Sequence, residues 1–184
     1  MAELQSEPEI VYFDLETQRS SGDVGGWSYR SRMGMSIGVT YSTLTKEYRV
    51  FGEKEVQELI DQLIAAKLVV GYNHVGFDYQ VLEAYTILDL ASQTMNLDLL
   101  VDIEKKLGRR IKLEDVAVPT LGVGKSAEGL QAIKWWREGK IREIAEYCAY
   151  DVKVTKCVHE FGRRHGFIKY QDHSGQAVEL KVEW

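Results

Sequence analysis

The sequence predicts an α/β protein in which helices flank a central mixed β-sheet. Two observations predict this fold class. Strand-like segments dominate the first 51 residues, and helical patterns then alternate with short apolar strands. A strand meander followed by such alternation is typical of a mixed sheet whose faces are covered by helices. Because no internal repeat or linker interrupts the pattern, we expect a single domain over residues 1–184.

Two sequence signals locate the elements in the first half of the chain: the alternation of apolar side chains and the positions of turn residues. Residues 1–8 are expected to form a flexible tail, and residues 9–15 the first strand. The Gly- and Ser-rich stretch 20–34 is expected to be a long loop, which is often a functional feature. Residues 35–42 and 47–51 have the composition of two strands joined by a short turn.

Helical spacing begins after these strands. Residues 53–66 carry apolar side chains three and four positions apart, as in an amphipathic helix. The short apolar stretch 67–73 predicts a buried strand, and a helix is expected over about 77–88. Residues 97–108 predict a further helix that ends at Gly108.

The last third of the chain is predicted to be mainly helical. Residues 113–122 indicate a short helix that stops near Pro119, and residues 141–166 carry the longest helical pattern. Residues 167–184 predict a closing β-hairpin, which would either pair with the sheet edge or contact a partner.

Composition and charge narrow the classes of function. The net charge is −5, from 23 basic and 28 acidic residues, which argues against a surface coated in basic side chains. Residues 105–112 nevertheless concentrate five basic residues in eight. No secretory signal begins the chain, and the apolar stretch 63–72 is too short to span a bilayer, so we expect a cytoplasmic protein with no membrane partner. Cys148 and Cys157 lie nine positions apart on one predicted helix and are expected to be reduced thiols.

The stretch VYFDLETQ, residues 11–18, places two carboxylates inside an apolar strand. Side chains two apart on a strand share a face, so Asp14 and Glu16 project together, away from Phe13 and Leu15. Such carboxylates are costly to bury unless something neutralises them. A half-exposed strand with a polar outer face would explain them equally well.

Two further motifs carry acidic residues. In GYNHVGFD a predicted strand ends at Asn73, and Asp78 follows in the first turn of a helix, where acidic residues are also common because of the helix dipole. In EYCAYD, Tyr147 and Asp151 are four apart and share one face of the longest predicted helix. Taken alone, that pair would also fit a solvated helix rim.

Taken together, the three motifs are specific in order and spacing. They read D-x-E on a first strand, N-x3-F-D at a strand-to-helix turn and Y-x3-D on a late helix, with the carboxylates Asp14, Glu16, Asp78 and Asp151. Over roughly residues 9–160 the sequence resembles the DEDD 3′–5′ exonucleases of the ribonuclease H-like superfamily. Tyr147 matches the tyrosine subtype (DEDDy), whose relatives include proofreading domains of family B DNA polymerases. The histidine subtype would have His at position 146, which is Glu146 here.

The resemblance implies a ribonuclease H-like fold and two divalent cations, Mg²⁺ or Mn²⁺, held by the four carboxylates. Asp14 would bridge both ions, Glu16 and Asp151 would hold the ion that carries the attacking water, and Asp78 would act mainly through water near the other. Tyr147 would orient the attacking water. Two such cations add +4 to the formal charge of −5, which leaves about −1.

The same resemblance suggests substrate contacts. Asn73 and Phe77 fall on family positions that flank the terminal nucleotide, although Phe77 is equally compatible with a place in the core. Trp27, in the expected loop, would stack on a base or lie in an exposed turn. Lys125 would reach a substrate phosphate. The GKS in this region is not a P-loop, because Pro119 occupies the position of the first glycine of that motif.

The sequence therefore predicts a metal-dependent 3′–5′ exonuclease that acts on single-stranded 3′ ends of DNA or RNA. Two alternatives remain open. One is an inactive ribonuclease H-like module that binds nucleic acid or a partner, and the other is a phosphohydrolase for small phosphate esters. Retention of all four carboxylates and the tyrosine favours the enzyme.

Overall fold

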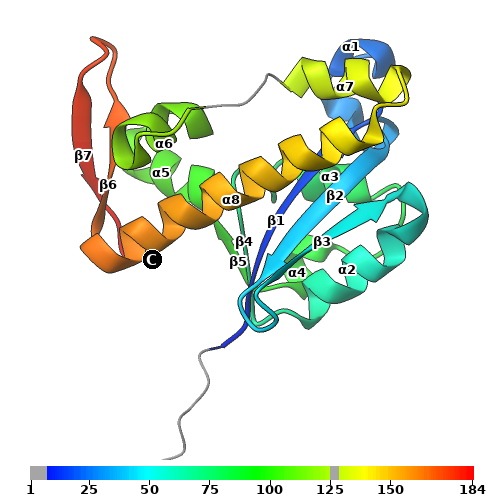
Figure 1. The fold of residues 1–184 in the computed structure, drawn as a ribbon, viewed down its shortest axis with the longest axis horizontal. Coiled ribbons are helices and arrows are strands. Elements are labelled where there is room, and N and C mark those ends of the chain that lie inside the picture. Colours follow the sequence, from blue (N-terminus) through cyan, green and yellow to red (C-terminus); the bar gives the residue numbers. More distant parts are fainter. Residues whose placement is uncertain (1–7, 125–128) are drawn as a thin grey trace, which may run out of the picture.

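A computed structural model of the chain describes residues 8–124 and 129–184 (Figure 1). The expected tail, apart from Pro8, and Lys125 lie outside the described residues. The central sheet contains β1 (Ile10–Thr17), β2 (Met35–Ser42), β3 (Glu47–Gly52), β4 (Leu68–Gly71) and β5 (Asn96–Asp98). Its order is β3-β2-β1-β4-β5, antiparallel among β1, β2 and β3 and parallel from β1 to β5. The predicted mixed sheet is thus confirmed.

The helices lie on both faces of this sheet. They are α1 (Ser21–Val24), the 3₁₀ helices η1 (Trp27–Arg32) and η2 (Glu53–Glu55), α2 (Val56–Ala65), α3 (Asp78–Leu82), α4 (Leu90–Gln93), α5 (Leu99–Leu107), α6 (Leu113–Leu121), α7 (Gly129–Arg137) and α8 (Ile141–His165). The long α8 crosses one face of the sheet diagonally, and α2 covers the other (Figure 1).

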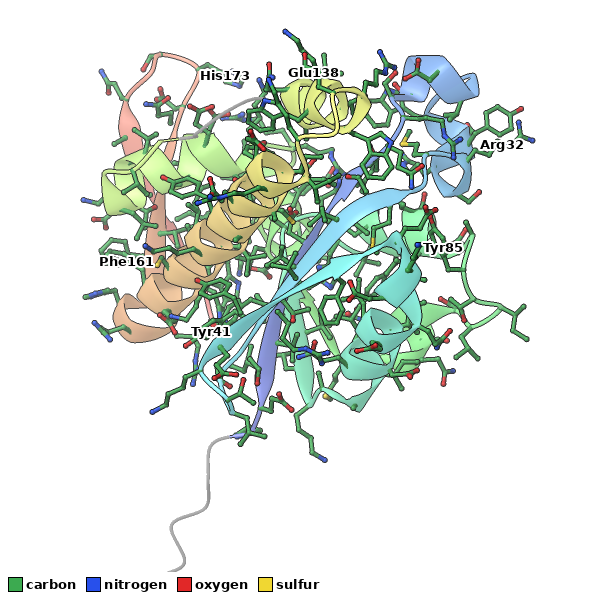
Figure 2. The ribbon with its side chains drawn as sticks, turned by 45° about the vertical axis from the view of Figure 1, so that its right-hand side comes forward. Arg32, Tyr41, Tyr85, Glu138, Phe161 and His173 are labelled. Atoms are coloured by element: carbon green, nitrogen blue, oxygen red, sulfur yellow. The ribbon has the colours of Figure 1, made fainter. Side chains whose placement is uncertain are left out.

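Period-two alternation along β1 builds the two cores. Tyr12 packs in the cluster that contains buried residues of α8, whereas Phe13 packs in the cluster that contains those of α2. The two layers are visible in Figure 2, where Tyr41 lies on the α8 side and Tyr85 on the α2 side of the sheet. The side chains at even positions of β1 therefore face α8.

The expected loop 20–34 is largely helical, so that prediction is wrong in part. Ser20 begins α1, because its hydroxyl accepts the Asp23 N–H at 3.2 Å and the Asp23 carboxylate accepts the Ser20 N–H at 2.8 Å. This reciprocal pair is a capping box, and its S-x-x-D pattern was present in the sequence. Gly25 ends the helix with a φ of +94°, a conformation that glycine adopts at little cost.

Two other boundaries differ from expectation. The helix expected over 77–88 is only α3, Asp78–Leu82, and Ile87 beyond it is fully exposed. Residues 96–98 form β5 against β4 instead of beginning a helix. The helix expected over 113–122 is confirmed as α6, which ends at Leu121, where the Gly122 N–H bonds the Val118 carbonyl at 2.9 Å.

The closing hairpin, β6 (Phe167–Gln171) and β7 (Ala177–Lys181), forms a separate two-stranded sheet and does not extend the central one. It packs beside α6, where the Thr120 hydroxyl accepts the Lys169 N–H at 2.9 Å. The Trp184 indole N–H donates to Asp102 at 2.8 Å. The hairpin therefore closes the end of the α8 core.

Two expectations on thiols and membranes can be compared with the structure. Cys148 and Cys157 are free thiols on α8. Across residues 8–124 and 129–184, none of the helices has the length and hydrophobicity required to cross a bilayer.

Candidate active site

Asp14 and Glu16 project from the central strand of the sheet. β1 pairs with β4 on one edge and β2 on the other, where Asp14 lies opposite Val39 and Glu16 opposite Ile37. The register shifts between Glu16 and Thr17, and such bulges are frequent beside functional sites because they re-aim a side chain. Both carboxylates face α8, on the side opposite Leu15.

The helix α8 brings Tyr147 and Asp151 to the same place. Carboxylate oxygens of Asp14, Glu16 and Asp151 lie within 4.8 Å of one another, although the two elements are more than a hundred residues apart in sequence. The spacing of four positions puts Tyr147 one turn before Asp151 on the same helix face. Ile144 and Val152 are buried and fix the orientation of this face.

Asp78 adjoins this cluster from a third element. It is the first residue of α3, its side chain is buried, and its carboxylate accepts the Leu15 N–H at 2.9 Å. A helix-dipole role explains an acidic residue at this position but not a carboxylate buried against β1. The structure thus brings together three of the four carboxylates directly and places Asp78 beside Asp14.

The negative charges of these carboxylates repel one another. Burial raises the pKa of Asp14 well above its ordinary value, and the charges of Asp78, Glu16 and Asp151 raise it further. Burial also raises the pKa of Asp78 to about 8, against the opposing effect of the Leu15 N–H. Half-buried, mutually repelling carboxylates with oxygen atoms this close match the ligand preference of hard divalent cations. The donor set therefore fits Mg²⁺ or Mn²⁺.

Tyr147 is buried against the cluster. Burial raises the pKa of its hydroxyl above the ordinary value of 10.0, and the charges of Asp151, Glu16 and Asp14 act in the same direction. A hydrogen bond to Asp151 also favours the protonated phenol. Tyr147 is therefore a hydrogen-bond donor at neutral pH, which disfavours a role as general base.

A cleft of about 800 Å³ opens over Asp14, Glu16 and Asp78. Trp27 and Phe77 line it, with ring centroids 6.3 Å apart in an edge-to-face arrangement. The side chain of Trp27 is 61 % exposed, whereas Phe77 is half-buried and also packs on the core. Phe77 therefore packs on the core and lines the cleft at the same time.

Asn73 lies at the edge of this cleft in a strained turn. Its φ of +67° is uncommon for a residue with a side chain. The Asp98 carboxylate accepts its N–H at 2.8 Å, and the Phe77 N–H bonds its carbonyl at 2.9 Å. The turn thus carries Asn73 and Phe77 to the cleft together.

Four residues near the carboxylates were not singled out by the motifs. The Cys148 thiol lies 3.4 Å from a carboxylate oxygen of Asp14, and Tyr72 lines the cleft beside Asn73. Arg110 and Lys112 reach the site from the connection between α5 and α6. The basic stretch 105–112 was the available signal for the two cations, but their position depends on the tertiary fold.

Comparisons with known proteins agree with this architecture. The RNase_H superfamily matches residues 11–161, which is most of the chain, so the chain belongs to that superfamily. A search of curated protein sequences finds no match.

Among solved structures, the chain is similar to the family B DNA polymerase from the hyperthermophilic archaeon Pyrobaculum calidifontis, with a TM-score of 0.63 and 18 % sequence identity. The similarity covers 85 % of this chain and 25 % of the polymerase chain, so this chain spans about a quarter of that protein. At this identity the similarity concerns the fold.

Proposed function

We propose that the protein is a metal-dependent 3′–5′ exonuclease of the DEDDy type that acts on the 3′ end of single-stranded nucleic acid by a two-metal-ion mechanism. One observation carries the proposal. Carboxylates from β1 and α8 converge within 4.8 Å, and those of β1 line a cleft that has aromatic side chains on its wall. Membership of the RNase_H superfamily and the similarity to a DNA polymerase support a nucleic-acid substrate.

Asp14, Glu16, Asp78 and Asp151 would hold two divalent cations, Mg²⁺ or Mn²⁺. Such ions supply an activated water and stabilise the charge on the attacking and leaving oxygens of the phosphodiester. The protein contributes rigid placement, because Asp14 and Glu16 stand on a strand that is paired on both edges.

The remaining residues would bind and orient the substrate. Tyr147, which stays protonated, would orient the attacking water through its hydroxyl group. Trp27 and Phe77 would stack on the terminal base, a contact that tolerates any base because every base has a π face. The Asn73 turn would border the terminal nucleotide.

The proposal is tested with single-stranded DNA and RNA oligonucleotides labelled at the 5′ end. With Mg²⁺ or Mn²⁺ we expect a ladder that shortens stepwise from the 3′ end, and no products with EDTA. The Asp14→Asn variant should retain the fold and lose cleavage by orders of magnitude. Binding without cleavage under every metal condition would instead indicate an inactive nucleic-acid-binding module, and cleavage of small phosphate esters alone would indicate a phosphohydrolase.

A further inference from the structure

We propose that Arg110 and Lys112 form a phosphate-binding site for the strand on the 5′ side of the scissile bond. We call the cavity around them the cationic lobe. The inference rests on the proposed function, which it extends by assigning a direction to the substrate across the cleft.

The cationic lobe is continuous with the aromatic cleft. It is a cavity of about 520 Å³ that shares four lining residues with the cleft of Trp27 and Phe77, namely Asp14, Tyr72, Asn73 and Lys112. Asp151 also lines the lobe. The two cavities therefore meet at the carboxylate cluster, and one extended ligand can occupy both.

The two cavities differ in chemistry. The rings of Trp27 and Phe77 line the cleft alone, together with Arg19, whereas Arg110 lines the lobe alone and Lys112 lies where the two cavities meet. The helix α6 begins at Leu113, which lines the lobe, so the positive end of its dipole lies there too.

The lobe also contains one acidic side chain outside the cluster. The Asp115 carboxylate lies 3.4 Å from the backbone nitrogen of Lys112, where it accepts the N–H at the start of α6. The Asp115 carboxylate therefore caps the start of α6 and also faces the lobe.

Two contacts orient the Arg110 guanidinium but do not use all of its hydrogen-bond donors. Its guanidinium donates to the Asn73 side-chain oxygen at 2.6 Å and pairs with Glu104 at 3.3 Å. A guanidinium carries five N–H donors in a fork that matches a phosphate, so these two contacts leave donors for a ligand. The pair with Glu104 joins side chains that are 55 % and 39 % exposed, and such surface pairs are weak enough for a phosphate to replace.

This asymmetry matches the asymmetry of a strand during 3′–5′ hydrolysis. One nucleotide lies beyond the scissile phosphate, and it offers a single base to stack on an aromatic side chain. The rest of the strand lies on the 5′ side and carries the repeated phosphates that cations bind. The terminal nucleotide therefore occupies the aromatic cleft, and the upstream strand leaves over Arg110 and Lys112.

The test compares two substrates that differ in upstream phosphates. A dinucleoside monophosphate has only the scissile phosphate, whereas a hexanucleotide has four more on the 5′ side. Arg110→Ala should lower cleavage of the hexanucleotide on the order of tenfold and leave the dinucleoside monophosphate within about twofold. Arg110→Lys should restore part of the loss, and Arg164→Ala, which removes an exposed arginine on α8, is the matched control.

A binding measurement keeps the test independent of catalysis and of a folding defect at one position. In the Asp14→Asn background, affinity for a fluorescent hexanucleotide is measured by anisotropy across salt concentrations. Arg110→Ala and Lys112→Ala should each reduce the slope of log affinity against log salt by about 0.7, the value for one contact to a single strand.

The outcomes distinguish a failure of the inferred phosphate site from a failure of the proposed exonuclease activity. Equal loss on both substrates would overturn the inference: with a reduced slope it would show that Arg110 serves the scissile phosphate, and with an unchanged slope that it serves the Asn73 turn. Wild-type protein that cleaves neither substrate would overturn the proposed function. In that case, a salt slope that responds to Arg110 and Lys112 would still support the phosphate site.

Discussion

Asp78 provides a test of the electrostatics of the site that does not require a substrate. The change is Asp78→Asn, which removes the charge and keeps an oxygen that can accept the Leu15 N–H. The variant is compared with wild type in EDTA, where no cation offsets the buried carboxylates. Asp61→Asn, at an exposed position of α2, is the control.

The expected size follows from proton linkage. The folded protein keeps the Asp78 proton up to a pH of about 8, whereas the unfolded chain releases it near 3.8. The unfolded state therefore binds fewer protons over this range, and the free energy of unfolding falls as pH rises from about 3.8 to about 8. At pH 7 and 1.36 kcal/mol per pH unit, the penalty has an upper limit of about 4 kcal/mol.

The assay is urea unfolding in EDTA at pH 4 and at pH 8. Asp78→Asn should match wild type at pH 4 and exceed it by up to a few kcal/mol at pH 8, while Asp61→Asn follows wild type at both. Mg²⁺ or Mn²⁺ should stabilise the wild type more than the variant. An Asp78→Asn protein with no gain at pH 8 would refute the argument that burial of this carboxylate opposes folding.

Three further predictions concern single side chains. Tyr147→Phe should reduce turnover about tenfold without changing metal affinity, and equal turnover would remove Tyr147 from the mechanism. Because the pKa of this phenol is raised, the pH–rate profile of the wild type should show no alkaline limb that is lost in the variant. Trp27→Ala should weaken single-strand binding about tenfold or more by anisotropy, since stacking contributes about 1–3 kcal/mol per base, and unchanged affinity would exclude stacking. Gly162→Ala should lower the free energy of unfolding, because a Cβ there would lie 2.5 Å from the Trp184 ring, and overpacking of about 1–3 kcal/mol exceeds the helix-propensity gain of about 1 kcal/mol. Gly22→Ala, where the nearest atom is 3.6 Å away, is its control in thermal unfolding, and a stabilised Gly162→Ala protein would contradict this packing.

Features set by local periodicity could be predicted from the sequence. The alternation of β1 indicated that Asp14 and Glu16 share a face, and the spacing of four indicated the same for Tyr147 and Asp151. The start of α3 was also located to within one residue, and Asp78 lies in its first turn as expected. These are short-range properties, and the chemistry of the motifs followed from them.

Features that depend on tertiary contacts could not be predicted in the same way. Three residues are too few to mark β5 as a strand, and it forms because β4 offers a free edge. The position of Arg110 over Asn73 joins residues 37 apart, and no periodicity encodes such a contact.

The most direct test of the central claim measures metal binding and cleavage on the same protein preparations. Mn²⁺ is titrated into wild-type protein and the Asp14→Asn variant by calorimetry, with a 3′-phosphorothioate oligonucleotide present, and cleavage of the unmodified strand is followed at each Mn²⁺ concentration. We expect two ions per wild-type chain, cleavage that rises with their occupancy, and loss of both in the variant. Full Mn²⁺ binding and cleavage in Asp14→Asn, or wild-type cleavage in EDTA, would contradict the assignment of these carboxylates as a catalytic metal centre.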